Sequence, residues 1–138
     1  MELEFAVDPE VDDAYPFRMQ GSDLFIADWG PMIEAIVEEM DAGYSIGVIA
    51  AKFHNTLAEM IVAVARRIEQ QQVVLTGGCF QNCKLTERCV QRLSEEGFRP
   101  YWHQRVPPND GGIALGQIVA VSLASARDRP DLKEVSLA

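Results

Sequence analysis

The sequence is short of basic residues and of long apolar stretches. Its 138 residues include 12 Lys and Arg against 21 Asp and Glu, which gives a formal net charge of -9. A surface for nucleic acid or an anionic membrane needs a basic patch, and this composition does not supply one. No uninterrupted apolar run approaches the ~20 residues of a membrane span, and the acidic first residues lack the pattern of an export signal. We therefore expect neither nucleic acid nor a membrane as a partner.

Cysteine is scarce, and its positions argue against a disulfide framework. Cys79, Cys83 and Cys89 are odd in number and lie close together, with a spacing that matches no standard zinc site. Free, partly buried thiols are the better interpretation, and they indicate a reducing cytoplasm. His54 has no partner histidine four residues away, so we interpret it as a core or hydrogen-bonding residue and not as a zinc ligand.

Several catalytic motifs are absent as well. The sequence contains no Gly-x4-Gly-Lys-Ser/Thr loop, no Gly-x-Gly-x-x-Gly, and no nucleophile elbow that would support a Ser-His-Asp triad. With 48% apolar and 24% charged residues, the composition is typical of a globular domain with its own core. We treat residues 1–138 as a single domain in which the polar residues 128–138 form a flexible tail.

The stretch from Val73 to Asn82 is the most informative part of the chain. Val73 to Thr76 is typical of a short strand covered on both faces. The pair Gly77-Gly78 then allows a sharp turn and leaves room for a ligand against the backbone. Asn82 is suited to cap a following helix, whose free amides could receive a phosphate or another anion. The glycines could equally serve the geometry of a tight turn alone.

The residues before this stretch predict a hairpin and two helices. Residues 15–20 and 23–28 are strand-like runs around a two-residue turn, Gly21-Ser22. A helix opens near Pro31 and ends at Gly43. A longer helix over residues 45–70 has the clearest 3.6-residue periodicity in the chain. The apolar face expected for the first helix consists of Met32, Ile33, Ile36, Val37 and Met40.

The residues after it predict a second strand and two more helices. A helix over 83–96, with Leu85, Cys89 and Leu93 as its inner face, and a strand over 98–103 complete a βαβ unit with parallel strands. A last helix is expected over 112–127.

The loop 105–112 links the second strand to that last helix and presents an aspartate. Pro107 and Pro108 make the loop rigid, and Asp110 follows at the mouth of the helix. Asp110 could be a helix cap, a metal ligand or a general base. Because the turns at 77–82 and 109–112 both follow strands of one unit, we expect them to face the same edge of the sheet.

The last helix carries a stripe of small residues. Gly112, Gly116, Ala120 and Ala124 lie four apart, which lets another helix approach closely. Ile113, Val119 and Leu123 are expected to bury its other faces. We expect a homo-oligomer that forms through this helix or through the early hairpin.

Two of these motifs together resemble the HypF family of carbamoyltransferases, which act in [NiFe]-hydrogenase maturation. The resemblance is carried by Gly77–Asn82 and Pro107–Gln117, with similar pieces in the same order at Tyr15–Phe17, Asp28–Trp29 and Ala50–Ala58. It covers nearly the whole chain. It implies an α/β fold that forms one lobe of an actin-like (ribonuclease H-like, ASKHA) ATPase, with a mixed sheet and flanking helices. Threonylcarbamoyl transferases of the TsaD type and carbamoyltransferases of antibiotic synthesis share this domain.

The resemblance also implies a reaction and roles for four residues. Gly77 and Gly78 would lie along a bound ATP, Asn82 would contact the acyl-adenylate, and Asp110 would complete a divalent-metal site. The family forms carbamoyl adenylate from ATP and carbamoyl phosphate. It then passes the carbamoyl group to the C-terminal cysteine of the partner HypE, where the group becomes a cyanide precursor.

The sequence departs from the family pattern in one important respect. The His-x3-His pair of the family's metal site has no counterpart, because neither His54 nor His103 has that spacing or context. Upstream phosphate-binding motifs are also missing, so we expect a lobe that is inactive by itself. One alternative is a stand-alone, non-catalytic module that binds a nucleotide or a protein. Another is a TsaD-like lobe acting on tRNA, against which the acidic charge and residues 107–112 argue.

Overall fold

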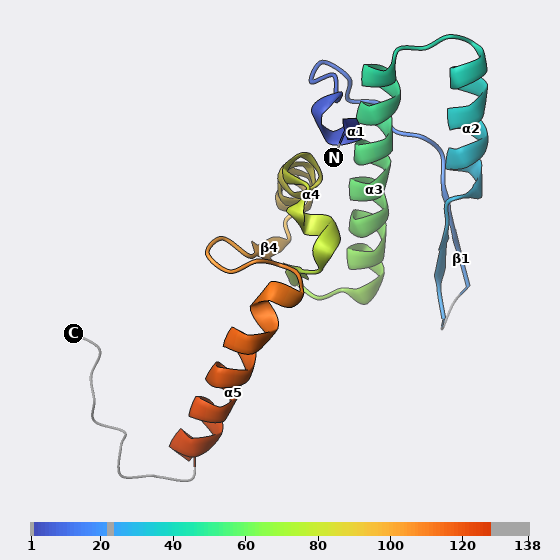
Figure 1. The fold of residues 1–138 in the computed structure, drawn as a ribbon. Coiled ribbons are helices and arrows are strands. Elements are labelled where there is room, and N and C mark those ends of the chain that lie inside the picture. Colours follow the sequence, from blue (N-terminus) through green and yellow to red (C-terminus); the bar gives the residue numbers. More distant parts are fainter. Residues whose placement is uncertain (1, 22–23, 128–138) are drawn as a thin grey trace.

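A long helix, α3, runs through the middle of the fold in the computed structural model, which describes residues 2–21 and 24–127 (Figure 1). The chain-terminal tail expected at 128–138 lies outside the described residues. In Figure 1, α2 and the β1–β2 hairpin lie on one side of α3, α4 and β4 lie on the other, and α5 projects from the body. The elements in chain order are α1 (Glu2–Phe5), β1 (Arg18–Gln20), β2 (Ile26–Asp28), α2 (Gly30–Asp41), α3 (Ile46–Ile68), β3 (Gln72–Leu75), η1 (Gly78–Gln81), α4 (Cys83–Glu95), β4 (Arg99–Trp102), η2 (Asp110–Gly112) and α5 (Ile113–Arg127).

Helix α3 starts and ends where the sequence predicts. The Ser45 hydroxyl accepts a hydrogen bond from the Val48 amide at 3.3 Å, and Glu69 stops the helix in a left-handed conformation. Although its apolar residues are interrupted by polar ones, α3 is by length and composition long and apolar enough to cross a membrane. In the 18-residue stretch of α3 that meets this criterion, 56% is buried inside the fold. This packing is typical of a core helix, and core helices can be as long and as apolar as a membrane span.

The main core lies between α3, α4 and β3. The inner face predicted for α4 is confirmed, because Leu85, Cys89 and Leu93 are at most 6% exposed. Burial raises the pKa of the Cys89 thiol to about 12, so this cysteine is an inert part of the core. Seven buried residues form the cluster: Ala58, Val62, Ala65, Leu75, Leu85, Cys89 and Leu93.

A second, smaller core lies between α2, α3 and the segment before β1. Tyr15, Met32 and Met60 are its buried members. The prediction of a buried apolar face on α2 is only partly confirmed, because Val37 and Met40 are 52% and 63% exposed. Helix α2 packs against α3 along one narrow strip, so its remaining apolar side chains face outward.

Polar side chains of α3 hold the chain segment before the hairpin. The Asn55 amide nitrogen donates to the carbonyl oxygens of Val11 and Asp13, each at 2.9 Å. The Thr56 hydroxyl accepts a hydrogen bond from the Tyr15 amide at 2.7 Å. Because both α3 residues are buried, these bonds fix a segment that has no regular structure of its own.

The strands form two separate small sheets. Strands β3 and β4 pair in parallel from Gln72 and Arg99 to Leu75 and Trp102, which confirms the predicted βαβ unit. Strands β1 and β2 pair antiparallel and confirm the hairpin, although β1 ends at Gln20 and β2 begins only at Ile26, later than predicted. The expectation of one mixed sheet is wrong for the described residues, because α3 separates the two pairs (Figure 1).

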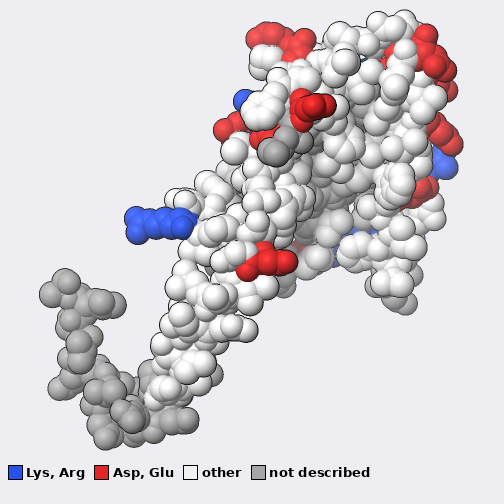
Figure 2. Space-filling model, in the orientation of Figure 1, with Lys and Arg blue, Asp and Glu red and all other residues white. Residues whose placement is uncertain are grey.

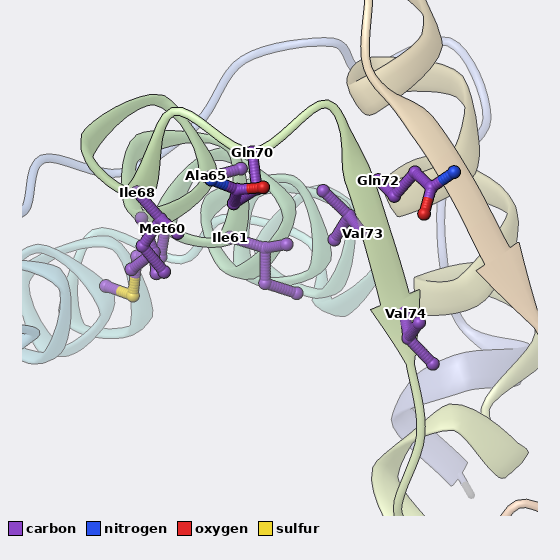
Figure 3. Close-up of a pocket in the computed structure, with 9 residues that line it drawn as sticks. Met60, Ile61, Ala65, Ile68, Gln70, Gln72, Val73 and Val74 are labelled. Carbon is purple, nitrogen blue, oxygen red and sulfur yellow. The ribbon is translucent and has the colours of Figure 1, made fainter.

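Strand β3 is covered on one face only. Leu75 is buried in the main core, whereas Val74 is 66% exposed, so the prediction of a strand covered on both faces is wrong. Figure 3 shows Val73 pointing toward Ile61 of α3, across an almost entirely apolar hollow of about 390 Å³ between α3 and β3. None of the site residues predicted from the sequence lines this hollow.

Helix α5 extends away from the rest of the fold. Its side chains from Ile113 to Ser125 are all exposed, so the expectation that Ile113, Val119 and Leu123 are buried is wrong. The apolar residues would be covered only by a neighbour lying along the helix, and the described elements do not provide one. Figure 2 shows this protruding rod without charged side chains in that view.

Candidate functional site

Two loops of the βαβ unit meet at the carboxyl end of β3. The Gly77 amide donates a hydrogen bond of 2.8 Å to the Pro108 carbonyl oxygen, and the Thr76 hydroxyl lies 3.0 Å from Nε2 of His103. The predicted meeting of the two turns at one sheet edge is therefore confirmed. Together they enclose an open cavity of about 470 Å³, lined by Thr76, Gly77, Gly78, Pro108, Asn109, Asp110 and Ile113.

Glycine at position 77 is required by the backbone. Gly77 has a φ of 104° and a ψ of 163°, a conformation that is essentially restricted to glycine. A Cβ atom placed there would have no other atom within 4 Å, so space is not the constraint. The turn geometry alone accounts for this glycine.

Glycine at position 78 has a different explanation. Its φ lies outside the positive range, and a Cβ atom there would meet nothing within 4 Å among the described residues. Neither the backbone nor a neighbouring atom therefore requires a glycine at this position. Gly78 is one of the residues that line the cavity, and the absence of a side chain there leaves room for a ligand close to the main chain.

Asp110 presents an available carboxylate to the same cavity. The capping residue of η2 is Asn109, whose Oδ1 accepts a hydrogen bond from the Gly111 amide at 3.0 Å, so the interpretation of Asp110 as the cap is wrong. Within residues 2–21 and 24–127, the Asp110 side chain has no hydrogen-bond or salt-bridge partner. The loop is closed tightly at Gly112, where a Cβ atom would lie 2.8 Å from the Pro107 carbonyl oxygen.

Asn82 caps α4, as the sequence predicts. Its Oδ1 accepts a hydrogen bond from the Leu85 amide at 2.9 Å, and its Nδ2 lies 2.8 Å from Nε2 of His54. Asn82 is not among the residues that line the cavity of Gly77, Gly78 and Asp110. It stands one turn further along, where η1 passes into α4.

His54 is the partner of Asn82 that the sequence did not reveal. It is 3% exposed, and its Nδ1 lies 2.7 Å from the Ala50 carbonyl oxygen. The interpretation of His54 as a core, hydrogen-bonding residue is therefore confirmed. Its pairing with Asn82 joins α3 to α4, and residues so far apart in the sequence form no recognisable local motif.

A carboxylate from α1 binds the first amide of α4. The Glu4 side chain accepts a hydrogen bond from the Cys83 amide at 2.6 Å, so a group from α1 contacts one of the amides that could receive an anion. Cys79 and Cys83 are free and exposed, and Cys89 is free and buried.

The described residues do not form a complete metal site. No group of three or more His, Cys, Asp or Glu side chains suited to hold a metal ion occurs in the part of the chain that the structure describes. Asp110 alone offers one carboxylate, whereas a hard divalent cation takes about six or more oxygen ligands. A metal at this cavity would need ligands from outside these residues.

Comparisons with known proteins give a consistent result. A family model described as "Carbamoyltransferase, Kae1-like Domain, second subdomain" matches residues 1–117. The carbamoyltransferase HypF of Synechocystis is 38% identical over 120 residues, which cover 86% of this chain and 15% of that protein. HypF2 of Cupriavidus necator is 38% identical over 92 residues, covering 64% of this chain and 11% of that protein.

Solved structures resemble the fold as well. Full-length HypF in a phosphate- and nucleotide-bound form superposes with a TM-score of 0.80 at 36% identity, covering 88% of this chain and 20% of that one. HypF from T. kodakarensis has a TM-score of 0.62 at 23% identity, a likeness of fold, with coverage of 88% and 16%. The chain thus spans about one fifth or less of the proteins that it matches.

Proposed function

The chain belongs to the HypF family of carbamoyltransferases, within the second subdomain of their Kae1-like domain, and we propose that it supplies the nucleotide-contacting lobe of such an enzyme. The observation that carries this proposal is Gly78, which lines the cavity. Neither the backbone conformation nor a neighbouring atom of the described chain requires a glycine at this position. ATP is the proposed ligand, with Gly77 and Gly78 along the nucleotide. The nucleotide-bound state of the similar HypF structure supports this choice.

The proposed reaction first cleaves carbamoyl phosphate to carbamate and inorganic phosphate. The carbamate oxygen then attacks the α-phosphate of ATP and forms carbamoyl adenylate, with pyrophosphate as the leaving group. The carbamoyl group then passes to the C-terminal cysteine of HypE, with AMP as the leaving group. In this scheme Asn82 contacts the acyl-adenylate and Asp110 is one ligand of a divalent cation. The relatives' name as carbamoyltransferases supports the reaction class. The role of Asp110 is supported by its place in the lining of the cavity and by a carboxylate without a partner among the described residues.

The chain alone is proposed to be inactive. It covers 15% of the Synechocystis relative, and among the described residues Asp110 is the one acidic residue that lines the cavity. Transfer chemistry therefore requires metal ligands and phosphate contacts from other parts of a HypF protein. The proposed compartment is the cytoplasm, in keeping with three free cysteines.

Self-association of this chain is proposed to occur through α5. Its exposed apolar residues and its stripe of small residues would pack closely against a second copy. Six large apolar side chains of α5 are at least 47% exposed: Ile113, Leu115, Ile118, Val119, Val121 and Leu123. The β1–β2 hairpin, with exposed Leu24 and Ile26, is the other candidate surface.

The alternative function is a stand-alone module that binds a nucleotide or a protein without catalysis. The incomplete set of metal ligands among the described residues favours it. The two proposals differ in a measurable way, because a HypF lobe should restore carbamoyl-dependent ATP cleavage to a HypF protein that lacks its own corresponding segment. A purely binding module should not.

ATP binding is tested by mapping amide chemical shifts in the isotope-labelled chain. The proposal expects ATP to shift signals of residues 76–82 and 108–113, at the two loops that enclose the cavity. The apolar hollow between α3 and β3 (Figure 3) is the internal control, because Ile61 and Val73 should stay unchanged. Shifts confined to that hollow, or no shifts at saturating ATP, would contradict the proposed site.

A further inference from the structure

A continuous hydrogen-bonded chain links α3 to the start of α4. The Ala50 carbonyl oxygen lies 2.7 Å from Nδ1 of His54, and Nε2 of the same ring lies 2.8 Å from Nδ2 of Asn82. The Asn82 Oδ1 then accepts the Leu85 amide proton at 2.9 Å. The His54 ring is 3% exposed and packs edge-on against Phe53, with ring centroids 5.7 Å apart.

Only one placement of the protons on His54 and Asn82 is compatible with all three hydrogen bonds. A carbonyl oxygen only accepts, so Nδ1 of His54 must carry the proton and donate to Ala50. In the neutral ring Nε2 is then an acceptor, which requires a donor from Asn82. The Asn82 amide nitrogen supplies that donor, which leaves its oxygen to cap α4. His54 and the helix start therefore select the same orientation of the amide.

We propose that His54 is a positioning residue that fixes the Asn82 side-chain amide in one orientation, one turn beyond the cavity proposed for the nucleotide. Capping α4 requires only a side-chain oxygen at position 82, which Ser or Asp would also provide. The hydrogen bond to His54 requires in addition an N–H donor, which the Asn82 amide provides. Within residues 2–21 and 24–127, His54 is the one hydrogen-bond partner of the Asn82 nitrogen, so its second proton keeps a fixed direction and is available to a ligand. This inference rests on the proposed role of Asn82 in contacting the adenylate.

A spectroscopic test can determine the orientation of the Asn82 amide without any ligand. In the isotope-labelled chain, at mildly alkaline pH, the His54 ring should show the Nδ1-protonated tautomer. His54→Leu should shift and broaden the Asn82 side-chain amide signals, because that amide loses its acceptor. The control is Asn55→Ala, which removes a neighbouring α3 amide bonded to Val11 and Asp13 and should leave the Asn82 signals in place.

The binding test separates positioning from general stability. His54→Leu should weaken ATP binding about tenfold, the size expected for one misplaced hydrogen bond. His54→Gln should restore most of the affinity, because its amide offers a donor toward Ala50 and an acceptor toward Asn82. In an Asn82→Ala background, His54→Leu should cause no further loss. Asn55→Ala should lower stability without lowering affinity.

The two tests fail in distinguishable ways. If the unaltered chain shows no saturable ATP binding, the proposed function fails and the spectroscopic test alone decides the role of His54. An Nε2-protonated ring, or Asn82 signals unmoved by His54→Leu, would overturn the positioning role. So would ATP affinity that falls equally for His54→Leu and His54→Gln while both variants remain folded.

Discussion

The amide of Gly77 and the carbonyl oxygen of Pro108 share a hydrogen bond of 2.8 Å. This bond joins the turn after β3 to the loop before α5, and it holds Gly78 and Asp110 on the wall of one cavity. The candidate site is thus built by a contact between loops that are distant in the sequence. Its geometry depends on a backbone conformation that only glycine adopts readily at position 77.

Gly77→Ala should destabilise the fold although the position is open. A side chain in this conformation is strained by about 1–3 kcal/mol, because of the positive φ and not because of a clash. Urea unfolding followed by circular dichroism measures the loss. Gly116→Ala, in an open position on α5 without a positive φ, is the matched control and should be neutral or slightly stabilising. Equal stability of Gly77→Ala and the unaltered chain would contradict the backbone argument.

The ion pair of Glu39 and Lys52 should make stability depend on pH. Burial by itself raises the pKa of Glu39, but hydrogen bonds from Lys52 and Tyr15 and the Lys52 charge outweigh it and hold the pKa below its ordinary 4.5. A carboxyl whose pKa is lowered in the fold stabilises it above the unfolded pKa, and this contribution is lost as the pH falls through the folded value.

The free energy of unfolding should therefore decrease as the pH falls below about 4.5. Glu39→Gln should be less stable at neutral pH and should show a shallower decrease, since its side chain does not titrate. Urea titrations across this pH range compare the two slopes. Identical slopes would mean that other carboxyl groups carry the whole effect.

Asp110→Asn should separate chemistry from stability. The carboxylate has no partner within the described chain, so the free energy of unfolding should change by less than about 0.5 kcal/mol. In a full-length HypF enzyme that carries this segment, carbamoyl-phosphate-dependent ATP cleavage should fall to background. Asp41→Asn, an exposed aspartate at the end of α2, is the control. Near-normal turnover of Asp110→Asn would rule out its role as a metal ligand.

A charge placed on α5 should reduce self-association. Ile118 is 64% exposed on a helix that lacks charged residues over most of its length, so a lysine there disfavours burial against a second copy. Analytical ultracentrifugation of the 15.3 kDa chain should show an average mass that rises with concentration and falls in Ile118→Lys. Ile46→Lys is the control, because Ile46 on α3 is exposed to a similar extent, at 69%. A monomer at all concentrations would contradict the proposal.

Local features of the fold were predictable from the sequence, since the signals are themselves local. The caps at Ser45 and Asn82 each bond an amide three residues ahead, and the inner face of α4 follows from its own periodicity. The parallel pairing of β3 and β4 follows from the helix between them.

Burial and long-range pairing were not predictable to the same extent. Periodicity shows which residues favour burial, but it cannot show whether a neighbour covers them, as the exposed Val74 and Leu123 demonstrate. The contacts of His54 with Asn82 and of Glu4 with Cys83 join residues far apart in the chain. No local pattern encodes such pairs, so the support of Asn82 became visible only in the structure.

The most direct test of the proposed nucleotide site is a calorimetric titration of ATP into the chain and its Gly78→Ala variant. A methyl group at position 78 meets no atom of the protein and needs no strained backbone, so the fold should keep its stability. If the open space is occupied by the nucleotide, Gly78→Ala should bind ATP at least about tenfold more weakly, a difference of about 1.4 kcal/mol, while Gly116→Ala binds normally. Equal ATP affinity of Gly78→Ala and the unaltered chain, or no saturable binding by either, would contradict the account.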